Sequence, residues 1–175
     1  MALLIGIMHM YTIISGTNRK NNTTIRIANI YQRVFKNNGV ETELLSLVDI
    51  FPEAGSESFK VLEEQYLQKA SKFIFVAPEY NGSIPGILKL LIDEAEWKSC
   101  WKNKKAMLVG VSTGRAGNLR GMDHLASILH HMHMQVMPFM LPLSRVDDIL
   151  NEDGEISDPS TMKNIEHQVK SFIQF

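Results

Sequence analysis

Five short apolar runs alternate with amphipathic stretches along the chain. The first run, Tyr11–Ile14, is rich in β-branched residues, and the third, Lys72–Ala77, is uninterrupted, as expected of a strand buried on both faces. The last run contains Pro138, which cannot donate a hydrogen bond to a neighbouring strand, so we place that run at the sheet edge. The pattern predicts strands at 11–14, 40–47, 72–77, 104–111 and 135–143.

The stretches between these strands carry apolar residues at helical spacing and predict helices. Asn38-Gly39 ends the first helix, and Pro85 opens the third, since proline suits the first helical turn. The segment 46–58, with a proline, a glycine and three serines, is expected to be a loop. The apolar positions that mark the five helices are Ile27, Tyr31, Val34 and Phe35; Phe59, Leu62, Tyr66 and Ala70; Ile87, Leu88, Leu91, Ile92 and Ala95; Met122, Leu125, Ala126, Leu129 and Met132; and Met162, Ile165, Val169, Phe172 and Ile173.

Strands that alternate with helices predict parallel crossovers with helices on both faces of one sheet. We therefore expect an α/β three-layer sandwich whose five-stranded parallel sheet has the order 2-1-3-4-5, with no room for a sixth strand or a second domain. Residues 10–175 are expected to form that single domain. Residues 1–9 are expected to lie outside it as a non-native or flexible leader; a natural extension packed on an oligomer surface is the alternative.

Composition excludes several classes of protein. A formal net charge of −1 argues against a nucleic-acid-binding protein and against a strongly acidic electron carrier. The apolar start of the chain is far shorter than the roughly 20 residues that a membrane span needs, so no membrane association is expected. The one cysteine, Cys100, allows no disulfide within the chain, which favours a reducing cytoplasm, and we expect it to be a part-buried structural thiol.

Ligands of open parallel sheets bind beyond the carboxyl ends of the strands, and the loop after the first strand is suited to an anion there. Gly16 allows close approach of the main chain, Arg19 offers a fork of donors, and three threonine hydroxyls flank them. The helix that begins near Thr23 adds its free N–H groups and positive dipole end. A polar helix cap, with threonine as N-cap, is the alternative. Because Gly16 is its only glycine, the loop is neither a dinucleotide loop nor a Walker loop.

Two further loops at the same edge have unusual composition. The loop 78–86 contains two prolines, the tight-turn pair Asn81-Gly82, and Tyr80, which could cover a flat ring. The loop 112–121 contains three glycines and two arginines; Arg120 either meets an anion or faces solvent. The three loops together predict one ligand site.

These loops resemble those of the NADPH-dependent FMN reductase family of flavodoxin-like proteins, which includes quinone, azo-dye and chromate reductases. Residues 16–19 and 22–24 match its Gly-Ser/Thr-x-Arg motif and the donors that follow. Residues 78–86, with Leu88, Lys89 and Asp93, match its second motif almost letter for letter. The third loop matches more loosely, since Gly117-Asn118 stands where the family often has paired glycines, and Asn21 and Asn22 replace frequent Gly or Ser.

The resemblance implies an FMN-dependent NAD(P)H oxidoreductase of flavodoxin-like fold. It would pass a hydride from NAD(P)H through bound FMN to a quinone, azo compound, free flavin or similar acceptor, with no side chain acting as catalytic acid or base. A homodimer or homotetramer is implied, with Glu79 and Arg115 as candidates to pair across a subunit interface. The implied cofactor-binding residues are Ser15, Thr17, Arg19, Asn22, Thr23, Thr24, Pro78, Glu79, Tyr80, Asn81, Gly82, Ser83, Ser112, Thr113, Gly114, Arg115 and Gly117.

Two other roles stay open: a flavodoxin-type carrier of single electrons, and a non-enzymatic flavin-binding regulator. The cluster His130-His131-Met132-His133 also suggests a metal site, but no acidic or third ligand is near in sequence. We interpret it as a helix end, where imidazoles lie near the negative pole.

Overall fold

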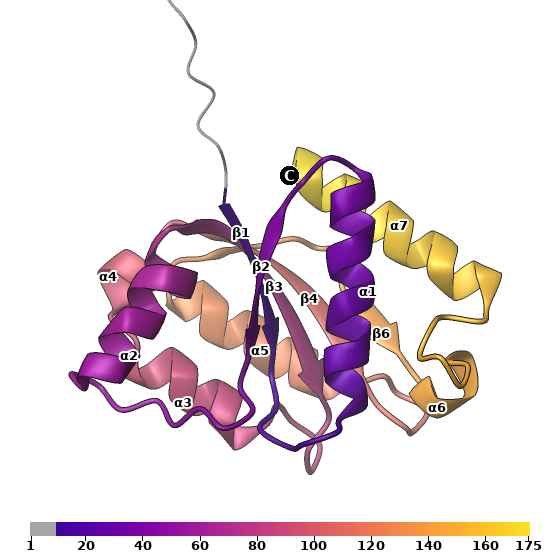
Figure 1. The fold of residues 1–175 in the computed structure, drawn as a ribbon, viewed down its shortest axis with the longest axis horizontal. Coiled ribbons are helices and arrows are strands. Elements are labelled where there is room, and N and C mark those ends of the chain that lie inside the picture. The colour runs from indigo at the N-terminus through magenta and orange to yellow at the C-terminus, as the bar shows by residue number, and fades with distance from the viewer. Residues whose placement is uncertain (1–9) are drawn as a thin grey trace, which may run out of the picture.

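Parallel strands form the centre of the molecule, and helices cover both faces of the sheet (Figure 1). The computed structural model describes residues 10–175, so the predicted leader at 1–9 lies outside the described residues. All strand pairings are parallel, in the order β2-β1-β3-β4-β5, which confirms the predicted order. The strands are β1 (Met10–Ser15), β2 (Thr42–Ser46), β3 (Ala70–Pro78), β4 (Lys105–Val111), β5 (Gln135–Val136) and β6 (Leu141–Leu143).

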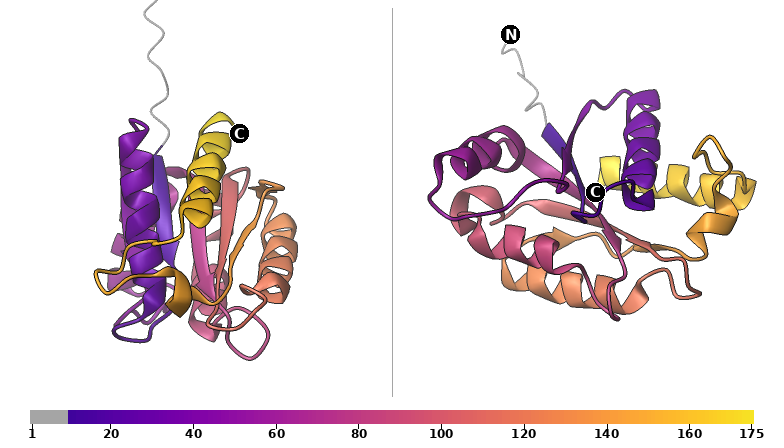
Figure 2. Two further views of the ribbon diagram at one scale, coloured as in Figure 1. Left: turned by 90° about the vertical axis from the view of Figure 1, so that its right-hand side faces the viewer. Right: turned by 60° about the horizontal axis from the view of Figure 1, so that its bottom comes forward.

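The three layers, a sheet with helices on both faces (Figures 1 and 2), are held together by two apolar cores, one on each face of the sheet. Successive side chains of a strand point to opposite faces, so Ile13 and Ile74 belong to the core under α1 and α7, and Phe73 and Phe75 to the core under α3 and α5. The helices are α1 (Thr23–Asn37), α2 (Glu57–Leu62), the π-helix η1 (Glu63–Gln68), α3 (Gly86–Glu94), α4 (Trp97–Cys100), α5 (Leu119–His131), α6 (Val146–Ile149) and α7 (Pro159–Gln174).

The strand predicted at 135–143 is two short strands rather than one. β5 pairs with the start of β4 and β6 with its end, and the offset between partners grows from 30 to 32 residues. Pro138 lies in the interruption, where no ladder hydrogen bond is required of it. The edge position is confirmed, but the expectation of five strands with no room for a sixth is wrong, because the interruption divides the last predicted strand and gives residues 10–175 a six-stranded sheet.

Gln168 of α7 replaces the hydrogen bonds that this interruption removes from the edge. Its fully buried amide Nε2 donates to the carbonyl oxygens of Leu108 and Phe139, at 3.0 Å each. Its Oε1 accepts from the Tyr31 hydroxyl at 2.6 Å. Helix α7 therefore supports the outer strands by a polar contact as well as by apolar packing.

The second predicted helix is also interrupted. Its first turns are α-helical, but the chain winds as a π-helix from Glu63 to Gln68, and Ala70, predicted as its last apolar position, begins β3. The buried carboxylate of Glu63 accepts hydrogen bonds from Glu96 N at 2.7 Å and Cys100 Sγ at 3.6 Å, which joins this segment to α4. Short α4 and α6 carry no periodic signal and were not predicted.

Lysines near the amino ends of the strands donate hydrogen bonds to carbonyl groups at helix ends. They lie at the edge of the sheet opposite the predicted site. Lys72 Nζ donates to the carbonyls of Phe172 and Ile173 at 2.8 and 3.1 Å, and burial and the charge of Lys105 lower its pKa. Lys104 likewise donates to two carbonyls at the end of η1, and burial lowers its pKa to about 8. These charges stabilise helix C-termini, where cations are favoured.

Candidate functional site

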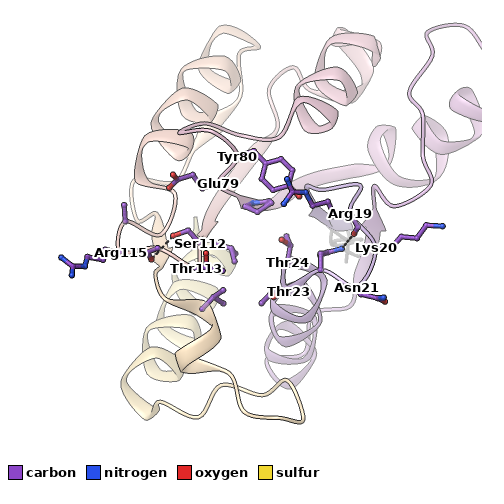
Figure 3. A pocket seen from close by; sticks show the side chains of 16 residues that line it. Arg19, Lys20, Asn21, Thr23, Thr24, Glu79, Tyr80, Ser112, Thr113 and Arg115 are labelled. Carbon is purple, nitrogen blue, oxygen red and sulfur yellow. Dashed lines mark hydrogen bonds between the residues drawn. The ribbon is translucent and has the colours of Figure 1, made fainter.

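The three loops predicted from the sequence surround one pocket of about 660 Å³ at the carboxyl edge of the sheet (Figure 3). Most of the predicted site residues line it: Arg19, Asn22, Thr23, Thr24, Pro78, Glu79, Tyr80, Ser112, Thr113, Gly114 and Arg115. The sequence analysis missed five lining residues, Lys20, Asn21, Val111, Ala116 and Val146. Lys20, Asn21 and Ala116 had a signal, their positions inside the predicted first and third loops. Val111 is the last residue of β4, and Val146 arrives from beyond β6.

The first loop leaves β1 against the neighbouring strand. Gly16 N donates to the carbonyl of Val76 at 2.9 Å, and a Cβ on Gly16 would come within 2.9 Å of Leu88 Cδ2. The Val76 carbonyl oxygen would also lie only 3.1 Å from that Cβ, so a side chain here would crowd β3, and glycine favours this close approach. The Oγ of Ser15, buried at the start of the loop, has no hydrogen-bond partner among residues 10–175.

Asn22, not a threonine, is the N-cap of α1. Its Oδ1 accepts from Ile25 N at 2.8 Å, and its Nδ2 donates to the carbonyl of Arg19 at 2.6 Å, so both ends of the amide hold the loop. The helix cap and the predicted anion donors, given as alternatives in the sequence analysis, therefore occur together in the same loop and first helical turn. Thr23 and Thr24 are the first two helical residues, and their N–H groups have no acceptor inside the helix. These N–H groups and the dipole make the start of α1 a site for negative charge.

The second loop contains a two-residue turn. Tyr80 N donates to Ser83 O at 2.9 Å and Ser83 N to Tyr80 O at 3.1 Å. Asn81 and Gly82 between them both have positive φ, 53° and 77°, which defines a type I′ turn and explains the Asn-Gly pair. Glu79 N donates to Val111 O at 3.0 Å, so this loop is also fixed to the end of β4.

Helix α5 lies against the outer side of that turn. Ser83 Oγ is 2.9 Å from His124 Nδ1, and a Cβ on Gly82 would lie 3.1 Å from Arg120 Nη1. Arg120 therefore contacts the turn and does not line the pocket. Neither do Asn81, Gly82 and Ser83, whose contact with a ligand stays a prediction.

The third loop is held in shape by hydrogen bonds of its own Ser112 side chain. Ser112 Oγ donates to Gly114 O and accepts from Gly117 N, at 3.1 Å each. A Cβ on Gly117 would come within 2.7 Å of Pro142, so this glycine serves packing against β6. Asn118, which follows it, is fully buried with φ 63°, and its Nδ2 donates to Ala77 O at 2.9 Å. Its anchoring role was missed, although asparagine tolerates positive φ better than other residues.

The first and second loops meet through side chains. Thr17 is fully buried and does not line the pocket, and its Oγ1 lies 2.5 Å from the Tyr80 hydroxyl. The guanidinium carbon of Arg19 lies 3.9 Å from the centre of the Tyr80 ring, and the two side chains stack in Figure 3. Tyr80, which was predicted to cover a flat ring, therefore contacts Thr17 and Arg19, which were predicted to bind an anion.

Positive charge prevails around the pocket. Arg19, Lys20 and Arg115 line it against the single carboxylate of Glu79. Arg115 points away from the centre (Figure 3), and Lys20 pairs with Asp49 at 3.2 Å, both largely exposed. The donors, the excess charge and the unpartnered Ser15 hydroxyl fit a phosphate at the first loop, and the pocket volume beside it suits a bound organic group.

Two other predicted features have structural roles. The histidine cluster ends α5, with His130 and His131 in its last turn, as predicted. Among residues 10–175, no three His, Cys, Asp or Glu side chains are placed to hold a metal ion. Cys100 is fully buried, which, with the nearby Glu63 charge, raises the pKa of its thiol to about 12 and makes it unreactive.

A family model described as NADPH-dependent FMN reductase matches residues 10–145 of the chain. A similar curated protein is the NADH:(hydroxy)cinnamate reductase subunit CrdA of Vibrio ruber, 26% identical over 94% of this chain and 86% of that protein. A quinone reductase of Pseudomonas putida is 37% identical over 63% of this chain. The alignment with that enzyme spans only 61% of its length.

Solved structures share the fold at low sequence identity. A flavoenzyme NAD(P)H:(acceptor) oxidoreductase, FerB of Paracoccus denitrificans, superposes with a TM-score of 0.78 at 22% identity, covering 95% of this chain and 96% of that one. An archaeal flavodoxin superposes with a TM-score of 0.63 at 13% identity, covering 95% and 97%. Both neighbours have the flavodoxin-like architecture found here.

Proposed function

This chain belongs to the NADPH-dependent FMN reductase family, and from that premise we propose that it reduces a small acceptor such as a quinone, azo compound or free flavin with electrons from NAD(P)H. Membership makes it a flavin-dependent oxidoreductase that uses FMN. When bound, FMN supplies the two-electron redox chemistry, and the protein binds, orients and tunes it.

The observation that supports this proposal most directly is the pocket formed by all three loops. The first loop would hold the phosphate, through Thr17, Arg19 and the start of α1, with Ser15 at its base. The second and third loops would hold the ring between Pro78–Ser83 and Ser112–Gly117. Their main-chain conformation is fixed by the turn hydrogen bonds and by Ser112, which keeps the site preorganised.

One purified sample tests the proposal. The protein, reconstituted with FMN and freed of excess, should show flavin absorbance bands, and these should bleach when NADPH or NADH is added without oxygen. A quinone should then restore the bands. Protein that neither retains FMN nor oxidises NAD(P)H contradicts the proposal.

The same experiment separates the two alternatives. A flavodoxin-type carrier would bind FMN but bleach slowly or not at all with NAD(P)H, and a flavin-binding regulator would retain FMN without turnover of any acceptor. The near-neutral net charge supports the enzyme over a carrier that is steered to basic protein partners.

Assembly and location are part of the proposal. We propose a homodimer or homotetramer in the cytoplasm, in which the exposed side chains of Glu79 and Arg115 pair between subunits. Sedimentation of Glu79→Ala should then give a lower mass than the unsubstituted protein; an unchanged mass contradicts the pairing. Within residues 10–175, no helix combines the length and apolar character that crossing a membrane requires.

A further inference from the structure

Tyr80 belongs to the second loop, yet its side chain is engaged by the first. Its hydroxyl contacts Thr17 and its ring contacts Arg19, while its main chain is fixed separately by the turn with Ser83. The contact joins two segments 63 residues apart. A side chain that served only to cover a ligand ring would not need both contacts.

The donors and acceptors around Thr17 indicate which of the two hydroxyls donates in this hydrogen bond. The Thr17 hydroxyl has one proton and two lone pairs, and one lone pair accepts from Arg19 N at 3.2 Å. An aromatic hydroxyl is a better hydrogen-bond donor than an aliphatic one, so we assign Tyr80 as the donor to the second lone pair. Both acceptor sites of Thr17 are then filled, and its own proton is left for a further acceptor at the first loop.

The ring of Tyr80 has a second effect. It supports the guanidinium of Arg19 at 3.9 Å, a cation–π contact that keeps a long, exposed side chain beside the start of α1. Arg19 forms no ion pair with any residue from 10 to 175 that would hold it otherwise. The hydroxyl and the ring therefore act on different donors of the same loop.

We propose that Tyr80 is a positioning residue that sets the preference of this protein for phosphorylated over unphosphorylated flavin. It orients the Thr17 hydroxyl and the Arg19 guanidinium toward the phosphate before the ligand arrives. The inference rests on the proposed function in that it takes the ligand phosphate to occupy the first loop.

The test compares FMN with riboflavin, which has the same ring and no phosphate, by titrating flavin-free protein and following the quenching of flavin fluorescence. Tyr80→Phe keeps the ring and removes one oxygen. It should raise the dissociation constant of FMN about fivefold, equivalent to about 1 kcal/mol, and change that of riboflavin less than twofold. Tyr80→Leu, which also removes the ring, should reduce the preference further. Tyr66→Phe, in η1, is the matched control and should leave both constants unchanged.

A double-mutant cycle tests the route through Thr17. In a Thr17→Val background, Tyr80→Phe should cost less than twofold in FMN binding, because the hydroxyl it positioned is gone. Thr17→Ser, which keeps a hydroxyl, should retain most of the preference.

The outcomes separate this inference from the proposed function. Suppose that the unsubstituted protein prefers FMN. The role of Tyr80 is then overturned, while the proposed function stands, if Tyr80→Phe keeps that preference or weakens the binding of both flavins equally. The same holds if Tyr80→Phe still raises the dissociation constant of FMN fivefold in the Thr17→Val background. If the unsubstituted protein binds riboflavin as tightly as FMN, the phosphate site itself fails, and the inference with it.

Discussion

Replacing Gln168 by Met should destabilise the protein far more than a substitution of similar volume usually does. The change keeps the apolar part of the side chain and removes three hydrogen bonds. The Tyr31 hydroxyl and the carbonyl of Leu108 belong to fully buried residues and would be left unpaired, whereas the half-exposed Phe139 can be hydrated. At about 1–3 kcal/mol for each unpaired buried group, the expected loss is about 4 kcal/mol.

Thermal and denaturant unfolding would measure this loss. At about 2–4 °C per kcal/mol for a chain of this size, Tm should fall by about 8–16 °C. Gln174→Met, an exposed position on the same helix, is the control and should change the free energy of unfolding by less than about 0.5 kcal/mol. Adding Tyr31→Phe to Gln168→Met should recover about 1 kcal/mol, because the unpaired hydroxyl is removed. A loss below about 1 kcal/mol for Gln168→Met would refute the role assigned to this side chain.

Three further substitutions test other parts of the molecule. Arg19→Ala should weaken FMN binding roughly tenfold or more by removing a charge-assisted contact, with riboflavin binding little changed; an unchanged FMN dissociation constant would place the phosphate elsewhere. Gly117→Ala should lower Tm by several degrees, because φ is 56° and the new methyl group would meet Pro142 at 2.7 Å; equal Tm values would contradict this strain. Burial raises the pKa of the Cys100 thiol to about 12 from 9.0, so the folded state holds a proton that the unfolded state releases, and stability is lost as pH rises from 9 to 12. The fall in Tm across that range should be shallower for Cys100→Ala, and identical slopes would argue against it.

The sequence predicted most of the sheet, and the three loops that line the pocket, because those features depend on local pattern. The uninterrupted run at Lys72–Ala77 and the loop at Pro78–Gly86 are readable without tertiary information. The π-helical winding after Leu62 could not be predicted, because the spacing of apolar residues in a π-helix is close to that in an α-helix. The π-helical segment is supported instead by contacts of Glu63 with α4. The break in the edge strand is compensated by Gln168, which lies far along the chain and whose sequence neighbours give no sign of that role.

In the candidate site too, some features follow from the local sequence and others depend on tertiary contacts. The donors of the first loop follow from residue type and from position at a helix start, but the choice of Asn22 over the adjacent threonines as N-cap is set by the geometry of the chain entering α1. The meeting of Tyr80 with Thr17 joins loops from different strands, and only the register of β1 against β3 brings them together.

The outer edge at β6 limits how copies of this chain can join. Leu143 turns its carbonyl to β4, where Ser112 N donates to it at 3.0 Å, so Pro142, one residue earlier, turns its main chain outward. An added strand would find no N–H at Pro142 and a displaced backbone at Pro138, and edges of this kind resist strand addition. Growth of a continuous sheet from this side, in a fibril or in an edge-to-edge dimer, is therefore disfavoured, and the opposite edge at β2 carries no such proline.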